Sequence, residues 1–283
     1  MTGVLLLGLL ASVCFGTSDF LGGTLSRRVP LLTVLLLSQV VGVLVTLTRL
    51  GSGEAPGDVG PALLWGVVGG LAVAVGVSCL YEALATGTMG VVAPIAALSV
   101  VVPVVAGVAG GDPVTPALVA GIVVAVAGTV LASGPELRAG TGRKGSGARP
   151  IVLALLSALG FGVSNLTIAL GSSHHVTTTL LANMVTTLVV YVVVALVRRH
   201  VPRASGRDLA GIAAIGVLGF GANLCFALAS RSGALSVVAV FASLFPVVTA
   251  LLGWWVHHER LRAVQVVGVI MVFAGVGVLA ATS

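Results

Sequence analysis

Two carboxylates, Asp19 and Glu82, stand inside long apolar stretches of this chain, and of all its side chains they have the most scope for chemistry. Asp19 follows a largely apolar run, and Gly16 and Gly23 would share its face of a helix. A charged side chain at the centre of a bilayer costs at least about 2.5–3.5 kcal/mol, so such a residue is expected to have a function. We therefore predict that Asp19 binds a proton or a cationic group. The alternative is that the helix ends early and that Asp19 pairs at the membrane surface with Arg27 or Arg28.

The other residues that commonly carry chemistry form no recognisable site. His257, His258 and Glu259 are adjacent, but no acid–histidine spacing elsewhere would complete a metal site. The three cysteines lie far apart within apolar runs, which is neither a disulfide framework nor a metal-ligand spacing. The chain has no phosphate-binding loop, nucleophile elbow, dinucleotide-binding glycine set or catalytic triad. We predict no catalytic residues, no metal and no cofactor.

The composition predicts a membrane protein. Charged residues make up only 8% of the 283 residues and hydrophobic residues 58%, whereas an ordinary soluble domain carries about 25% charge. The net charge of +6 comes from short basic clusters between apolar runs, which is the pattern of loops between membrane-spanning helices rather than of a nucleic-acid-binding surface. We therefore expect membrane lipid, and not nucleic acid, around this protein.

The apolar runs predict an all-α protein with ten transmembrane helices. Each run is near the about 20 residues that a helix needs to cross a bilayer. Cutting the sequence at charges and at proline and glycine clusters gives five spans in each half. These spans are 3–25, 31–50, 61–84, 90–110 and 114–133, and then 150–170, 177–197, 209–230, 234–256 and 262–281.

The two halves repeat one another, with a first repeat over 1–133, a polar linker over 134–149 and a second repeat over 150–283. A five-helix repeat ends on the opposite side of the membrane from its start, so its copy is inserted upside down. Inverted repeats of this kind are typical of secondary transporters. The matching landmarks are Phe-Gly-x-Ser at Phe15 and Phe161, Ala-Leu-Ala at Ala83 and Ala227, and the glycine pairs Gly121 with Gly128 and Gly268 with Gly275.

Neutral amides stand where the first repeat has its acids. Asn165 occupies the position of Asp19, and Asn223 falls near the position equivalent to Glu82. These four residues are our candidate site for substrate or coupling ion, in a cavity that is acidic on one repeat and hydrogen-bonding on the other. Two alternatives remain: the amides bind helices together, and Glu82, near the end of its span, is an interfacial glutamate.

The repeat relation also predicts where the site lies. Inverted repeats place the substrate at their interface near the midplane, so Asp19 and Asn165 are expected to face one central cavity. Gly16 and Gly162 are expected to leave room for substrate beside each polar group.

The second repeat ends with the pattern Phe-Pro-Val-Val at Phe245, Gly-Trp-Trp at Gly253 and Glu-Arg-Leu at Glu259. With this pattern and the repeated motifs, the whole chain resembles the EamA branch of the drug/metabolite transporter superfamily. The first repeat departs from the pattern, with Asp112 in place of the usual glutamate and the proline displaced to Pro103. The resemblance implies ten helices around a central cavity and transport of amino acids, drugs or other metabolites, often outward.

These observations predict a secondary transporter that exports a small metabolite, amino acid or drug-like compound by alternating access, either coupled to protons or as a facilitator. It would reside in the plasma membrane of a bacterium, with a small-molecule substrate and with homodimer formation left open. The alternatives are an integral membrane enzyme acting on a lipid-linked substrate and a divalent-cation carrier on the same fold.

Basic residues are distributed unequally between the two sets of loops. Basic loops stay in the cytoplasm, so the charge bias predicts that both termini face outward, whereas the resemblance implies a cytoplasmic amino terminus. The loops on the side of the termini hold Arg49 and Arg231. The opposite loops hold Arg27, Arg28, Arg138, Arg143, Lys144, Arg149, Arg198, Arg199, Arg203, Arg207, Arg260 and Arg262.

Overall fold

The protein is all-helical throughout the residues that its computed structural model describes, which are 2–48, 58–102, 105–106, 115–138, 148–232, 245–258 and 263–282. The described helices of the first half are α1 (Thr2–Leu25), α2 (Leu31–Leu47), α3 (Val59–Thr86), α4 (Met89–Ala96), the 3₁₀ helix η1 (Ala97–Val100) and α6 (Pro116–Arg138). Those of the second half are α7 (Ala148–His174), α8 (Val176–Val197), α9 (Gly206–Ser232), α11 (Phe245–His257) and α12 (Ala263–Thr282).

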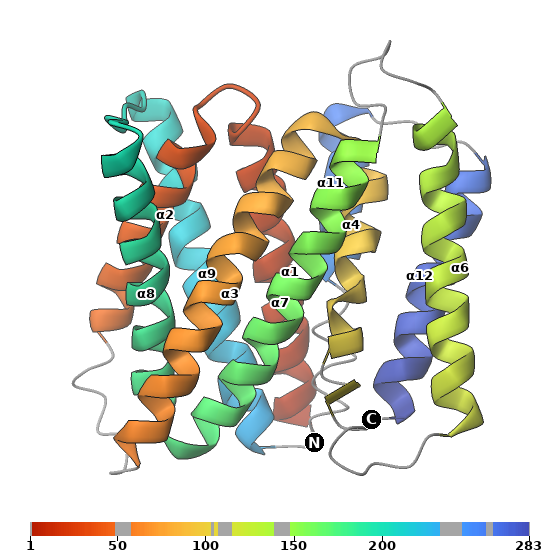
Figure 1. Ribbon diagram of the computed structural model, residues 1–283, viewed down its shortest axis with the longest axis horizontal. Coiled ribbons are helices and arrows are strands. Elements are labelled where there is room, and N and C mark those ends of the chain that lie inside the picture. The colour runs from red at the N-terminus through yellow and green to blue at the C-terminus, as the bar shows by residue number, and fades with distance from the viewer. Residues whose placement is uncertain are drawn as a thin grey trace.

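The helices stand side by side, and both chain termini lie at the same edge (Figure 1). We call this edge the terminal end. The α1–α2 turn, the α8–α9 connection and the start of α7 lie at the opposite edge. We call that edge the basic end, because it carries Arg27, Arg28, Arg149, Arg198 and Arg207. α1 therefore runs from the terminal end to the basic end, and its repeat mate α7 runs the other way.

Five helices in the described part of the chain are long and apolar enough to cross a membrane: Leu6–Leu25, Val59–Thr86, Ala148–His174, Val176–Val197 and Gly206–Ala229. Large apolar side chains on their outer faces are exposed, as lipid contact requires, including Leu64 on α3 and Leu196 on α8. Trp254 and Trp255 near the end of α11 are also exposed, as expected for residues that anchor a helix at the membrane surface. The protein is a multi-pass membrane protein.

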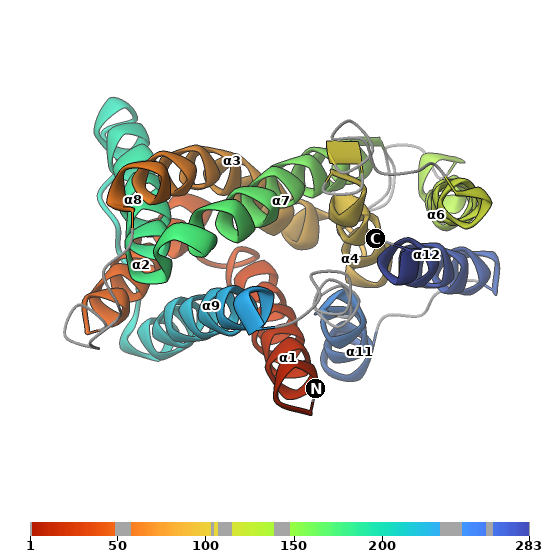
Figure 2. The ribbon, with the colours of Figure 1, turned by 90° about the horizontal axis from the view of Figure 1, so that it is seen from below.

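The packing of the helices follows the duplication. α3 packs on α7 as α1 packs on α9, and α3 packs on α8 as α2 packs on α9. α1 contacts α11 as α7 contacts α4 and η1, while α6 pairs with α12, α2 with α8 and α4 with α11. If each helix is replaced by its repeat mate, every one of these helix pairs becomes another of the pairs named here or stays the same. α6 and α12 form a pair at one edge of the molecule, and α12 also contacts α4 and η1 (Figures 1 and 2).

The structure differs from the predicted organisation in two places. The span predicted over 90–110 is interrupted, since α4 ends at Ala96 and the chain tightens into η1. Pro94 inside α4 removes a backbone donor, which disfavours a continuous α-helix. The linker predicted over 134–149 is shorter, because α6 continues to Arg138 and α7 begins at Ala148. The part of the span 234–256 before Phe245 lies outside the described residues, as do Asp112, Pro103 and Glu259.

Candidate functional site

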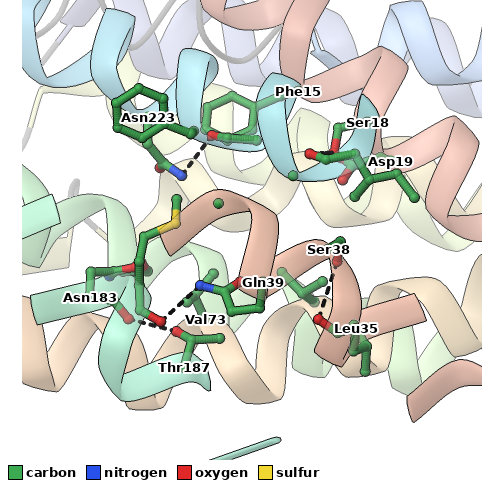
Figure 3. Close-up of a pocket in the computed structure, with 18 of the residues that line it drawn as sticks. Phe15, Ser18, Asp19, Leu35, Ser38, Gln39, Val73, Asn183, Thr187 and Asn223 are labelled. Carbon is green, nitrogen blue, oxygen red and sulfur yellow. Dashed lines mark hydrogen bonds between the residues drawn. The ribbon is translucent and has the colours of Figure 1, made fainter. Parts of the chain in front are cut away.

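A cavity with a volume of about 90 Å³ lies between α1, α2 and α3 and their repeat mates α7, α8 and α9 (Figure 3). A water needs roughly 10–15 Å³ of such volume, so the cavity has room for several waters or a small ligand. Both repeats contribute polar groups to its wall. The polar lining residues are Ser18, Asp19, Ser38, Gln39, Tyr81, Ser164, Asn165, Asn183, Thr187, Tyr191 and Asn223.

Asp19 lies on α1 and lines this cavity, with only 6% of its surface exposed. The alternative of a helix that ends early does not fit, because α1 continues beyond Asp19 to Leu25. No basic side chain among the described residues pairs with its carboxylate. Arg28 instead forms an ion pair with Asp208, at 2.7 Å, and Arg27 donates a hydrogen bond to a backbone carbonyl of α3 at 3.1 Å. Asp19 is thus a buried acid without a basic partner in the described part of the chain.

Asn165 on α7 and Asn223 on α9 line the same cavity as Asp19. The Nδ2 group of Asn223 donates to the carbonyl of Gly219 in its own helix, at 3.0 Å, so this amide does not tie two helices together. The structure therefore places Asp19, Asn165 and Asn223 in the wall of one cavity.

Glu82 is not part of this cavity. It lies near the end of α3, and its Oε1 accepts a hydrogen bond from the guanidinium of Arg149 at 2.9 Å. Both side chains are partly exposed, by 30% and 74% respectively. Since α3 ends one turn later, at Thr86, Glu82 reaches the basic end of the molecule. Its environment is that of an interfacial glutamate.

Further polar groups in the cavity wall form hydrogen bonds between helices. Gln39 on α2 donates to the carbonyl of Met184 on α8 at 2.9 Å, and Asn183 donates to the Oγ of Ser164 on α7 at 3.4 Å. Thr187 on α8 donates to a carbonyl of α3 at 3.0 Å. The bonds of Gln39 and Thr187 join helices of the two repeats, while that of Asn183 joins α8 to α7 within the second repeat. Their one signal in the sequence is a polar residue within an apolar run.

Comparison with known families decides what kind of protein carries this cavity. The profile of the EamA-like transporter family matches the chain twice, over residues 1–134 and 148–281. The chain belongs to the EamA-like transporter family. It is therefore a membrane transporter of the drug/metabolite transporter superfamily, built from two copies of the family's repeat.

Solved structures support the fold of this EamA-like transporter. Twenty-three chains of solved structures match it. A crystal structure of one protein aligns with a TM-score of 0.67 and 19% sequence identity, covering 98% of this chain and 96% of that chain. At this identity the likeness shows the fold alone. No curated protein matches the chain.

The motif glycines of the EamA-like transporter do not leave room for substrate, and this expectation was wrong. A Cβ atom at Gly16 would lie 2.5 Å from the carbonyl oxygen of Phe245 on α11, and one at Gly162 would lie 2.5 Å from that of Ser99 on η1. Each glycine therefore permits close packing between two helices. Residues three apart on a helix differ in direction by about 60°, so Gly16 faces α11 while Asp19 faces the cavity.

The described residues offer no cluster for a metal ion, since no three His, Cys, Asp or Glu side chains among them converge. His257 on α11 contacts the Oγ1 of Thr24 on α1 through its Nε2, at 2.9 Å, and its ring lies 5.4 Å from that of Phe20. It thus serves as a contact between α1 and α11.

Proposed function

We propose that this EamA-like transporter is a secondary transporter that crosses the membrane ten times and exports a small metabolite, amino acid or drug-like compound by alternating access. Asp19 carries a proton or the cationic group of the substrate through the cycle. The observation that supports this proposal most strongly is a buried carboxylate without a described basic partner, in a cavity to which both repeats contribute.

The energetics of Asp19 favour a reversible ligand. A charge buried without a partner is strongly unfavourable, and either a proton or a cation bound at the carboxylate relieves this cost. Because the cavity lies between the repeats, a rocking motion of one repeat against the other exposes the same carboxylate to each side in turn. Asn165, the repeat mate, is neutral, so the two mates contribute one acid and therefore one charge per cycle.

The rest of the cavity wall suits a small amphipathic molecule. Phe15 and Phe161 line it as repeat mates, and both rings contact Phe245, with centroids 6.1 and 6.4 Å apart. Apolar surface with a few well-placed polar groups is the usual composition of a ligand site. Asp19 and Asn165 then supply the polar contacts for such a molecule.

The experiment that tests this proposal uses Asp19→Asn, which keeps the shape of the side chain but removes its charge. The purified transporters are reconstituted in liposomes, and pH-gradient-driven fluxes of amino acids and cationic compounds are measured. We expect the variant to lose at least about 90% of the flux, equivalent to about 1.4 kcal/mol or more. Its gel-filtration profile and melting temperature should match those of the original protein. A variant with the original rate and pH dependence would refute the role of Asp19.

We further propose that the protein resides in a bacterial plasma membrane with its basic end in the cytoplasm and both termini outside. The concentration of arginine at one end supports this orientation. The test compares Ser205→Cys at the basic end with Ser173→Cys at the terminal end, in a protein without the native cysteines. An impermeant thiol reagent applied to intact cells should label the cysteine at 173 and spare the one at 205. The reverse pattern would place the termini in the cytoplasm.

A further inference from the structure

A second, larger cavity lies beside the central one. It has a volume of about 740 Å³, is lined by α2, α3 and α8 near the basic end, and is partly open to the surface. Its walls are largely apolar, with Leu31, Val75 and Val194 among the lining residues, while Glu82, Arg198 and His200 also line it. We call this space the vestibule. It combines apolar walls with charges of both signs, which matches a molecule with an apolar body and a charged group.

The vestibule and the central cavity share part of their wall. Leu35 on α2 and Tyr191 on α8 line both spaces. Each is nearly fully buried, with 3% of its surface exposed. These two side chains therefore form a partition between the vestibule and the cavity that holds Asp19.

The hydrogen bond that holds Tyr191 in the partition can be released at low cost. The Tyr191 hydroxyl donates to the carbonyl of Ala74 on α3 at 3.1 Å. The same carbonyl accepts a bond from the Oγ of Ser78 at 2.6 Å, and it is also the helical partner of the Ser78 amide. A carbonyl oxygen has two lone pairs, so Ala74 keeps its partners when Tyr191 leaves. The hydroxyl would turn toward a space wide enough to hold water, which spares it the cost of an unsatisfied buried group.

We propose that the vestibule is a second site on the substrate's route, through which an amphipathic molecule with a charged group passes between the basic end and the central cavity. Tyr191 and Leu35 act as the gate between the two spaces. The use of this route by substrate rests on the proposed transport function, but the openness of the vestibule and the role of the gate do not. Those two features are therefore tested without substrate.

The first test uses the native Cys79, which lies in the vestibule wall. Cys225 is the control, because it is also partly buried but lines neither cavity. Two proteins, each retaining one of these cysteines, are reconstituted in liposomes and treated with a small, positively charged methanethiosulfonate. We expect Cys79 to react about tenfold faster, equivalent to about 1.4 kcal/mol in access. Equal, slow rates at Cys79 and Cys225 would overturn the proposal. A lipid chain that fills the vestibule would give this result.

The second test addresses the gate. Ser38 lines the central cavity but not the vestibule, and its hydroxyl donates only within α2, to the carbonyl of Leu35 at 3.2 Å. Ser38→Cys in a protein without other cysteines therefore reports reagent that has passed the gate. We expect Tyr191→Phe to raise the reaction rate of the cysteine at position 38 about fivefold, the effect of losing one hydrogen bond. Tyr81→Phe is the control, because Tyr81 is equally buried and lines only the central cavity.

The outcomes separate this inference from the proposed function. The gate would be overturned if Tyr191→Phe left the reaction rate of the cysteine at position 38 unchanged, in a protein with an unaltered gel-filtration profile. Transport that depends on Asp19, together with an unreactive Cys79, would overturn the vestibule and leave the proposed function intact. A reactive Cys79 and a Tyr191-dependent gate would support the inference, even where no tested compound is transported.

Discussion

The contact between α6 and α12 and the central cavity are both built from matching positions of the two repeats, but they use the match differently. At the α6–α12 contact, Gly128 lies against Gly268 and Val272, while Gly275 lies against Gly121 and Ala125. Both repeats thus use glycine in the same way. In the cavity, Asp19 and Asn165 are also repeat mates, but one is an acid and the other a neutral amide.

The two regions differ because backbone contact constrains one of them and not the other. A Cβ atom at Gly128 would lie 2.6 Å from the carbonyl oxygen of Gly268, and one at Gly275 would lie 2.6 Å from that of Gly121. Two helix backbones meet here, so neither repeat can carry a side chain. In the cavity the facing side chains leave space between them, and the two positions can carry different chemistry. Substitutions at the helix contact should therefore affect folding, and those in the cavity should affect transport.

Exchanging the side chains of Asp19 and Asn165 tests whether the two cavity positions are equivalent. Asn165→Asp in the Asp19→Asn protein returns one carboxylate to the same cavity from the opposite repeat. We expect the exchanged protein to recover pH-gradient-driven flux to about a tenth of the original rate, a remaining loss of about 1.4 kcal/mol. The flux assay in liposomes measures it, with Asp19→Asn alone as the control. An exchanged protein that folds but transports no better than that control would show that the carboxylate must stand on α1.

The helix contact is tested by two alanine substitutions on α12. Gly275→Ala places a methyl group against the backbone of α6 and should lower the free energy of unfolding by about 1–3 kcal/mol through overpacking. Gly277→Ala, two residues later, meets open space, and should be neutral or stabilise the helix by up to about 1 kcal/mol. Thermal unfolding in detergent compares them. Equal melting temperatures would mean that α6 and α12 do not pack as closely as described.

The sequence predicted the membrane class, the duplication and the shared cavity, because these depend on composition, spacing and symmetry. It could not decide which neighbour a residue faces. The spacing of Gly16 and Asp19 put them on one helix face, whereas a rotation of about 60° separates close packing from cavity lining. Glu82 looked equivalent to Asn223 by position, but its place near the end of α3 carries it to Arg149. Tyr191 carries no signal in the sequence, since its role depends on two spaces formed by three helices.

The smallest expected effect concerns ion pairs at the basic end, where the repeats again meet through unlike residues. Arg28 in the α1–α2 turn pairs with Asp208 on α9 at 2.7 Å, and Arg149 pairs with Glu82 at 2.9 Å. The arginines are 59% and 74% exposed, so water and salt screen both pairs, and each contributes about 0–1 kcal/mol. Arg149→Gln should therefore lower the free energy of unfolding by less than about 0.5 kcal/mol, and Arg28→Gln, whose partner is less exposed, by up to about 1 kcal/mol.

Thermal unfolding at low and high salt distinguishes these pairs from the helix contact. Added salt should lower the free energy of unfolding of the original protein toward that of the Arg28→Gln variant, because screening removes the same interaction that the substitution removes. It should leave the difference between Gly275→Ala and Gly277→Ala unchanged, because steric contact is not screened. If the effect of Arg28→Gln exceeded that of Gly275→Ala and persisted at high salt, charge pairing at the basic end, rather than glycine packing, would be the stronger constraint on how the two repeats meet.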